Sequence, residues 1–287
     1  MNFKLLFPTY RQRYTFVRDQ LARLRAARGG PFPRALNLGA GEGDYDPMIA
    51  AHCGCLDACD VNEADLAHAR ALNRHLPHVH YALEDAQRLS YPDAAFDLVV
   101  STDVIEHVPD SVAMLREVAR VLRPGGAAII TFPSRRFPAT YDPLNRLLGR
   151  GEKKFAFGAY AFGHFKLIAE EEFEAWCAAA GLRIARREYL TGPLAAVVEM
   201  YWPGFLQRLL KANAANANAP KRGPVLRPDA REPALARLTD AWIALDRAVC
   251  RGSRSSVGVG CVLERAQPPG GGAAAPPHAP WRSAASR

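Results

Sequence analysis

Three glycines at every second position directly follow a short apolar run, in the segment Leu36-Asn37-Leu38-Gly39-Ala40-Gly41-Glu42-Gly43. An apolar run that enters alternating glycines predicts a strand and then a tight turn, whose backbone a ligand can approach without meeting Cβ atoms. A dinucleotide-binding turn has the different spacing G-x-G-x-x-G, in which a helix starts behind the second glycine and receives a pyrophosphate. The turn therefore predicts a ligand held against backbone, and that ligand need not carry a phosphate.

From Pro33 onward, short apolar runs alternate with helical patterns, which predicts an α/β fold with a parallel sheet covered by helices on both faces. The predicted strands are Ala35–Leu38, Gly54–Cys59, Val79–Leu83, Phe96–Val100, Ala127–Phe132 and Leu182–Leu190. Predicted helices cover Asp46–His52, the residues from the cap Asn62 to Arg74, those after the cap Asp110, and those from Glu170 to Gly181. Together these elements form a core domain over residues 31–190.

Residues 1–30 read as a basic amphipathic helical arm attached to this core. Seven Lys and Arg face a single acid, Asp19, so the arm carries a net charge of +6. Its apolar stripe consists of Tyr10, Tyr14, Val17, Leu21 and Leu24. We expect the stripe to dock on the core, with Arg11, Arg18 and Arg25 on another face that is solvated or contacts a membrane surface or nucleic acid.

Composition and segment lengths argue against export and against a metal site. The N-terminal apolar run is too short for a signal peptide, and the stretch from Pro193 to Leu210 is interrupted by Glu199, Pro203 and Gly204. Three close cysteines have no matching His or Cys pair, so we expect them to pack in the core and expect no metal; they are Cys53, Cys55 and Cys59. These features predict a cytoplasmic protein, either free or peripheral to the inner membrane face.

The ordered motifs between Leu36 and Ser134 resemble those of class I S-adenosylmethionine-dependent methyltransferases, particularly the group containing the ubiquinone-biosynthesis O-methyltransferase. Besides the glycine turn, the matching motifs are Asp57-Ala58-Cys59-Asp60-Val61, Glu84-Asp85-Ala86, Phe96-Asp97-Leu98-Val99-Val100-Ser101, Glu106-His107-Val108-Pro109 and Leu122-Arg123-Pro124-Gly125-Gly126. The resemblance implies a Rossmann-like sheet of seven strands with an antiparallel last strand. We assign that strand to Ser256–Leu263, within residues 253–265.

The resemblance implies S-adenosyl-L-methionine as the cofactor and assigns its adenosine half to residues after the second and third strands. Asp60 would accept hydrogen bonds from the ribose hydroxyls, as its position at the strand end also allows. Asp85 would accept from the adenine amino group, Ala86 would offer its N–H, and Val61 would flank the ring. The structural alternatives are a helix-capping or solvated Asp60 and an Asp85 that only forms a turn.

The remaining cofactor contacts fall on the first and fourth strands. Gly39, Gly41 and Gly43 would lie under the cofactor, and Ser101 would line its methionine half, although a serine is also ordinary at a strand end. Asn37 stands where the family commonly has an acidic residue, and it could still orient the loop.

Two histidines are candidates for a general base that removes a proton from the methyl acceptor. His107 follows the fourth strand, close to where the methyl group is expected. Asp103 and Glu106 have capping-box spacing, however, so this stretch also reads as the start of a short helix with a structural Glu106. His164 lies in an aromatic, glycine-rich connection and could instead anchor that loop.

Three further segments surround the core. Residues 135–168 are rich in basic and aromatic residues, which suits a mobile lid or, equally, a segment that contacts a membrane surface and presents an apolar or amphiphilic acceptor there. Residues 191–252 read as a helical insertion with a polar linker at 211–233. In the insertion, Leu235, Leu238, Trp242, Leu245 and Val249 recur at helical spacing. We expect this stripe to be core and its helix to cap the pocket, with a dimer or membrane contact as the alternatives. Residues 266–287 read as a disordered tail.

These observations predict a methyltransferase acting on a small, hydrophobic or phenolic acceptor, with O-methylation favoured. Two alternatives remain open: an RNA-modifying methyltransferase that uses the basic arm, and a non-catalytic module with this fold. Motifs for a P-loop, a serine-hydrolase elbow and a zinc protease are absent from the sequence.

Overall fold

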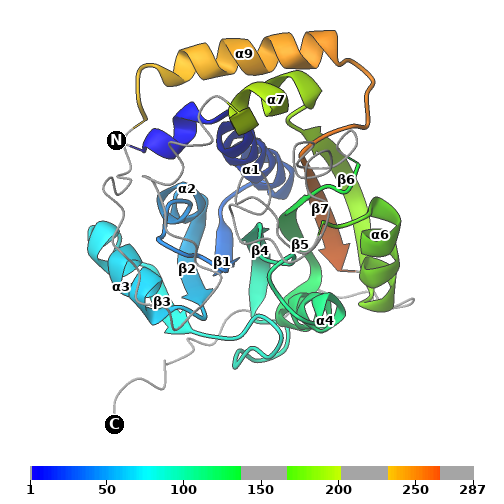
Figure 1. The fold of residues 1–287 in the computed structure, drawn as a ribbon. Helices are drawn as coiled ribbons and strands as arrows, with labels where there is room; N and C mark the ends of the chain where they lie inside the picture. Colours follow the sequence, from blue (N-terminus) through cyan, green and yellow to red (C-terminus); the bar gives the residue numbers. More distant parts are fainter. Residues whose placement is uncertain (1, 137–166, 202–231, 266–287) are drawn as a thin grey trace, which may run out of the picture.

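The structure is a computed structural model that describes residues 2–136, 167–201 and 232–265. Within these residues, seven strands form one sheet in the order β3-β2-β1-β4-β5-β7-β6 (Figure 1). The strands are β1 Phe32–Leu38, β2 Cys53–Asp60, β3 Val79–Leu83, β4 Phe96–Thr102, β5 Leu122–Pro133, β6 Leu182–Leu190 and β7 Gly258–Arg265. Strands β1 to β5 pair in parallel, whereas β7 runs antiparallel to both β5 and β6. The predicted seven-stranded sheet with an antiparallel last strand is confirmed.

The described helices begin largely where the sequence signals predict. They are the 3-10 helix η1 Phe3–Leu6 and the α-helices α1 Pro8–Arg28, α2 Asp46–Ala50, α3 Glu63–Leu72, α4 Ser111–Val121, α6 Glu170–Ala179, α7 Pro193–Tyr201 and α9 Ala236–Val249. The Asn62 side chain accepts from the first backbone N–H groups of α3, and the Asp110 side chain does the same for α4. No described helix combines the length and apolar character that crossing a bilayer requires.

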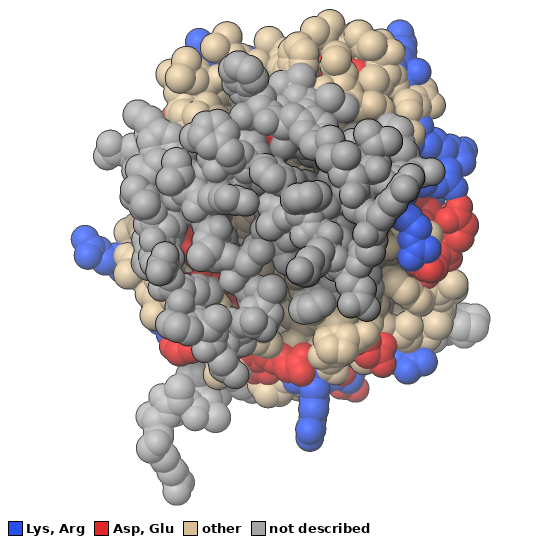
Figure 2. Space-filling model, viewed as in Figure 1, with Lys and Arg blue, Asp and Glu red and all other residues tan. Residues whose placement is uncertain are grey.

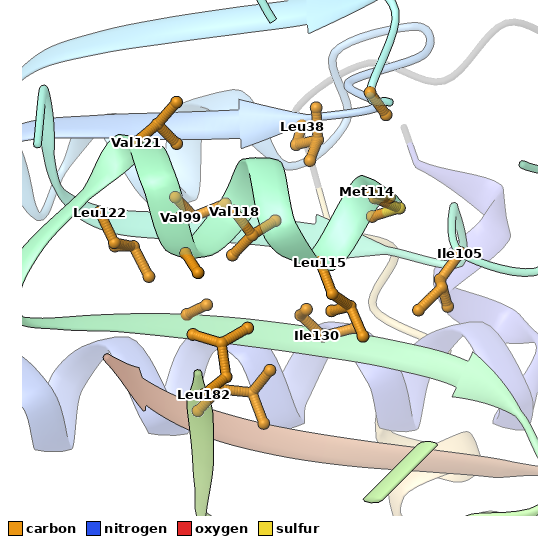
Figure 3. Packing of buried hydrophobic residues seen from close by; sticks show 14 of the residues in the cluster. Leu38, Val99, Ile105, Met114, Leu115, Val118, Val121, Leu122, Ile130 and Leu182 are labelled. Carbon is orange, nitrogen blue, oxygen red and sulfur yellow. The ribbon is translucent and has the colours of Figure 1, made fainter. Parts of the chain in front are cut away.

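Apolar residues cover the sheet on both faces. On one face, α4 and α6 pack Leu115, Val118 and Phe173 against the strands, and Figure 3 shows the α4 residues beside Val99 and Ile130. On the other face, α1 and α2 pack against β1, β2, β4 and β5. Helices thus cover both faces of the sheet. The carboxyl ends of the strands lie at an edge that is lined by loops.

Helix α1 docks by its predicted stripe, since Val17 and Leu21 have no exposed surface. The expectation for Arg11 is wrong, because its side chain does not lie on a free basic face. It is 4% exposed, and its guanidinium donates to both carboxylate oxygens of Asp240 at 2.8 Å and contacts Glu232 at 2.6 Å. The periodicity of residues 1–30 cannot reveal this burial, because the covering helix α9 comes more than 200 residues later in the chain.

Buried polar contacts join α1, α7 and α9 into one layer at the upper edge of the molecule (Figure 1). The carboxylate of Glu199 in α7 accepts from the Thr9 N–H and hydroxyl at 2.6 Å, near the start of α1. Asp246 in α9 accepts from the N–H groups of Gly192 and Ala195 at 2.7 and 3.1 Å. These N–H groups lie at the start of α7, so one carboxylate satisfies donors that a helix start leaves unpaired.

The prediction that the α9 stripe belongs to the core is wrong. The exposed fractions are 62% for Leu235, 68% for Leu238, 47% for Leu245 and 65% for Val249. The helix instead buries Ala236, Thr239, Ile243 and Asp246. Polar contacts explain the choice, because Asp246 binds the start of α7 and the Thr239 hydroxyl donates to the Leu6 carbonyl at 3.0 Å.

We expect the substitution Asp246→Ala to lower the free energy of unfolding by about 1 to 3 kcal/mol, because it leaves two N–H groups at the start of α7 without their acceptor. Urea unfolding measures this loss. Asp246→Asn retains a carbonyl acceptor and should lose less. An Asp246→Ala variant as stable as the unsubstituted chain would contradict the role assigned to this carboxylate.

Candidate active site

The strand order reverses direction next to the first strand. The chain runs from β1 outward through β2 and β3, and then crosses back so that β4 lies on the other side of β1. In open α/β sheets, ligands bind outside the carboxyl ends of the strands at such a reversal. The last residues of β1, β2 and β4 and the residues that follow β1, β2 and β3 meet at this edge, and the predicted cofactor residues are among them.

The three glycines of the turn after β1 all have positive φ, but their surroundings differ. A Cβ atom at Gly39 would overlap the Val104 side chain, and one at Gly43 would lie within 2.8 Å of Asn73, Ala69 and Asp46. A Cβ atom at Gly41 would meet nothing within 4 Å. Gly39 and Gly43 are therefore required by packing, whereas Gly41 presents bare backbone to open space, as a ligand held against the turn requires.

A cluster of buried polar side chains supports the turn from below. Asp46 accepts from the Asn37 amide and from the Tyr81 hydroxyl, each at 2.7 Å. Asn73 donates to the Gly43 carbonyl at 3.0 Å and to Asp46 at 3.4 Å. Asn37 is 1% exposed and thus lies beneath the turn, in the loop-orienting position expected for it.

Asp60 joins the end of β2 to the open side of the turn. Its carboxylate accepts from the Gly41 N–H at 2.9 Å and from the Asn62 N–H at 3.0 Å. Two apolar side chains lie exposed at the ends of neighbouring strands, Val61 at 56% and Leu83 at 58%. The sequence indicates Val61 but not Leu83, whose exposure at the end of β3 depends on how β2 and β3 pair.

Asp85 forms a turn in the loop after β3, as the alternative to a role in adenine binding expects. The exposed Asp85 carboxylate accepts from the Gln87 backbone N–H at 2.9 Å and from its side-chain amide at 3.2 Å, while Ala86 is buried. The Gln87 side chain also accepts from the Asp110 N–H at 2.9 Å. Gln87, which sequence reasoning missed, therefore connects the Asp85 loop to the start of α4.

Residues 103–110, which follow β4, form turns rather than the short helix expected from the capping-box spacing. Asp103 has a left-handed φ of 53°, accepts from the Thr131 hydroxyl at 2.8 Å and pairs with Arg13 of α1, so its carboxylate does not cap a helix. Glu106 is fully buried, and its carboxylate lies 3.8 Å from Nε2 of the partly exposed His107.

Ser101 has no exposed surface, and its hydroxyl has no hydrogen-bond partner within the described parts of the chain. A buried hydroxyl without a partner costs free energy, so it commonly marks contact with a water or a ligand. This property fits the expected place of Ser101 beside a bound molecule at the end of β4.

The N-terminal segment reaches the same edge of the sheet. Lys4 pairs with Glu42 at 3.1 Å and with Asp44, and the Tyr10 hydroxyl donates to Asp44 at 3.3 Å. The Tyr10 ring also contacts the ring of Tyr45, at 5.9 Å between centroids. The acids within and just after the glycine turn and the basic residues of the N-terminal arm are the sequence signals for this contact. Their pairing joins residues about 40 positions apart, which a local pattern does not reveal.

The second candidate base, His164, lies outside the described residues. The same holds for most of the expected lid and for nearly all of the expected linker. Among the described residues, no group of three or more His, Cys, Asp or Glu side chains is placed to hold a metal ion. Of the two predicted bases, only His107 lies among the described residues, in the loop after β4.

Comparison with known proteins relates the part of the chain that forms this edge to a known family. Residues 36–130 match the family described as "Methyltransferase domain". A probable S-adenosylmethionine-dependent methyltransferase of Mycolicibacterium smegmatis is 35% identical over 136 residues, which cover 47% of this chain and 52% of the relative. The chain spans about half the length of the first curated relatives it matches, at 52% and 46%.

Two relatives have named roles. Trans-aconitate 2-methyltransferase of Methylobacterium nodulans is 30% identical, over 58% of this chain and 62% of the relative. The ubiquinone biosynthesis O-methyltransferase of Coxiella burnetii is 26% identical, over 52% and 63% respectively. A solved structure of a putative sarcosine dimethylglycine methyltransferase from Galdieria sulphuraria matches 88% of this chain and 86% of its own, with a TM-score of 0.57 and 17% identity, which shows a common fold.

Burial raises the pKa of Asp46 from its ordinary value of 3.8 to about 6, against the hydrogen bonds from Asn37 and Tyr81 that lower it. Between these values the folded chain holds a proton that the unfolded chain has released. The contribution of Asp46 to the free energy of unfolding should therefore fall as pH rises through this range, by at most about 1.4 kcal/mol per pH unit. Urea unfolding at several pH values tests this slope, and Asp46→Asn should remove it. Equal slopes in the two proteins would refute the assignment.

We expect Gly41→Ala and Gly43→Ala to separate ligand binding from stability. Gly43→Ala should cost about 2 to 4 kcal/mol of unfolding free energy, because its methyl group overlaps three neighbours. Gly41→Ala should cost only about 1 kcal/mol, for its positive φ, yet weaken S-adenosylhomocysteine binding at least about tenfold. Calorimetry measures the affinity. Unchanged affinity in Gly41→Ala would show that the ligand does not approach this backbone.

Proposed function

Because this chain belongs to the class I S-adenosylmethionine-dependent methyltransferases through residues 36–130, we propose that it transfers a methyl group to a small, hydrophobic or phenolic acceptor, with oxygen as the atom methylated. The observation that carries the proposal is the pairing of Asp60 with the bare backbone of Gly41 at the reversal of the strand order. This arrangement holds a carboxylate where a ribose can bind, next to a turn that a ligand can approach closely.

The surrounding residues fit the adenosine half of the cofactor. Asp60 would exchange its bond to Gly41 for bonds from the ribose hydroxyls, or share its oxygens between them. The exposed Val61 and Leu83 would cover the two sides of the adenine ring. Burial of these two side chains against the ring would be favourable, because apolar surface leaves water. Asp85 and the Ala86 N–H would bind its polar edge.

The other end of the cofactor would lie near the end of β4. Ser101 would give its buried hydroxyl a partner there, and the turn formed by Gly39 and Gly41 would support the molecule from one side. When bound, S-adenosylmethionine supplies an electrophilic methyl group on a sulfonium. The chain's task is to hold the acceptor in line with that group and keep water out, an effect worth up to about 7 to 11 kcal/mol in well-oriented reactions.

His107 is the proposed base among the described residues. It lies just past β4, its imidazole is partly exposed, and the buried Glu106 carboxylate is 3.8 Å away. A nearby carboxylate orients an imidazole and stabilises the protonated ring that forms when it accepts a proton from a hydroxyl. His164 remains a second candidate for the same step.

The acceptor class is supported by the chain's sequence. The expected lid and insertion are rich in aromatic and aliphatic residues, as an apolar or phenolic acceptor requires. Two relatives are named for different acceptors, a tricarboxylic acid and a ubiquinone precursor, so the domain alone does not select one. The second of these names states O-methylation, which is the chemistry proposed for this chain.

The two alternatives receive less support from the described residues. Arginines of the basic arm are engaged within the chain: Arg11 with Asp240, Arg13 with Asp103, and Arg28 with Asp97 at 3.4 Å. Phosphates of RNA would have to displace these carboxylates. A non-catalytic module needs no base, whereas the loop after β4 holds His107 beside the Glu106 carboxylate.

Labelling of cell extracts tests the proposed function. The purified chain and a donor labelled on its methyl group are added to an extract of cells that lack the chain, and the organic-soluble, aqueous and RNA fractions are counted. We expect label in organic-soluble small molecules, as a methyl ether identified by mass spectrometry. Asp60→Ala should weaken S-adenosylhomocysteine binding roughly ten- to a hundredfold and abolish labelling at low donor concentration.

Controls separate the possible causes of a loss. Asp19→Ala removes an exposed carboxylate of α1 and should leave binding and labelling unchanged. His107→Gln should keep the affinity for S-adenosylhomocysteine but lose the rise of turnover with pH that an imidazole base produces. Label in RNA, or a chain that binds no cofactor product at all, would refute the proposal.

A further inference from the structure

We propose that the outer surface of α9 docks on an anionic lipid surface. The proposal combines four exposed apolar side chains of the α9 stripe, Leu235, Leu238, Leu245 and Val249, and the partly exposed Trp242 between them, with exposed arginines on the same helix and on the turn that follows it. It does not depend on which acceptor the enzyme methylates.

The apolar side chains of this surface account for most of the exposed large apolar side chains among the described residues. Leu235, Leu238, Leu245 and Val249 are four of the six large apolar side chains that are exposed among the described residues. The other two, Val61 and Leu83, lie at the candidate cofactor site. Exposed apolar surface costs free energy in water, and a contiguous patch of it marks a binding surface more often than isolated side chains do.

The charged part of the surface is basic. Arg237 and Arg247 lie on α9 and Arg251 and Arg254 just after it; all four are exposed and none forms an ion pair with a carboxylate of the described residues. The acids of the described helix are otherwise engaged, Asp240 with Arg11 and the buried Asp246 with the start of α7. In Figure 2 the upper edge, over α9, is mostly uncharged with Lys and Arg at its two corners.

Charge and size favour a lipid surface over a protein partner. A second copy of the chain would bring the same arginines together, whereas anionic headgroups attract them. A single helix of 14 residues is about 21 Å long, and one flank of it falls well short of the roughly 800 Å² per partner of a stable protein interface. A helix that exposes Leu and Val side chains together with Arg suits the boundary between headgroups and acyl chains.

The position of α9 in the fold allows this contact. The helix lies along one edge of the molecule (Figure 1). Thr239 binds it to η1, Asp240 to Arg11 of α1, and Asp246 to the start of α7. Its outer surface can therefore meet a membrane without unfolding any described element. Docking in this way would be peripheral.

Vesicle sedimentation tests the proposal with the full-length chain. Phosphatidylcholine vesicles containing about one third phosphatidylglycerol are compared with vesicles of phosphatidylcholine alone, at low and high salt. We expect binding to the anionic vesicles, weakened by salt. Leu238→Gln/Leu245→Gln should reduce the partition coefficient about tenfold or more, and Arg247→Gln/Arg251→Gln should reduce binding to the anionic vesicles only.

A matched pair of variants guards against misfolding. Val61→Gln/Leu83→Gln removes the same kind of exposed apolar side chain at the cofactor site, so it should keep vesicle binding and lose affinity for S-adenosylhomocysteine. Leu238→Gln/Leu245→Gln should show the reverse. If neither protein binds S-adenosylhomocysteine but the vesicle results hold, the proposed function fails and the docking surface stands.

Two outcomes overturn the proposal. One is a chain that stays in the supernatant with both kinds of vesicle. The other is a chain that does not bind vesicles but dimerises in solution by light scattering and becomes monomeric in Leu238→Gln/Leu245→Gln, which would assign the stripe to a second copy.

Discussion

The site depends on the close approach of the turn after β1 to α2 and α3. Gly43 has no room for a Cβ atom between Asn73, Ala69 and Asp46, and these neighbours hold the turn from below through buried hydrogen bonds. With its lower side packed in this way, the turn can present only Gly41 on its open side, where Asp60 accepts from the backbone N–H. The place proposed for the ligand thus depends on packing on the opposite side of the turn.

Much of the core could be predicted from the sequence because its signals are local. Strands β3 and β6 have the predicted bounds, and Asn62 and Asp110 cap the helices expected to follow them. Period, caps and glycine spacing each act over a few residues, and in this chain they agree. The predicted strands therefore place Asn37, Asp60, Val61, Asp85 and Ser101 at or near the carboxyl ends of the strands, at one edge of the sheet.

Predictions failed where the outcome depends on distant partners. A helical stripe shows that a helix has two faces, but not which face the fold will cover. In α9 the polar bonds of Asp246 and Thr239 outweigh the leucines and turn these outward, and α9 in turn buries Arg11, which the local pattern predicted to be exposed. The capping-box spacing of Asp103 and Glu106 failed for a similar reason, since Thr131 and Arg13 engage the carboxylate that would have capped the helix.

Helix α1 contacts both the loop after β1 and helix α9. Tyr10 bonds to Asp44 in the loop after the glycines, and the next residue, Arg11, bonds to Asp240 in α9. A molecule that shifts α1 by binding at one of these surfaces also changes the contacts of α1 at the other surface. Thermodynamic linkage then makes the effect reciprocal: any change in affinity that the occupant of α9 causes at the turn is matched by an equal change that the occupant of the turn causes at α9.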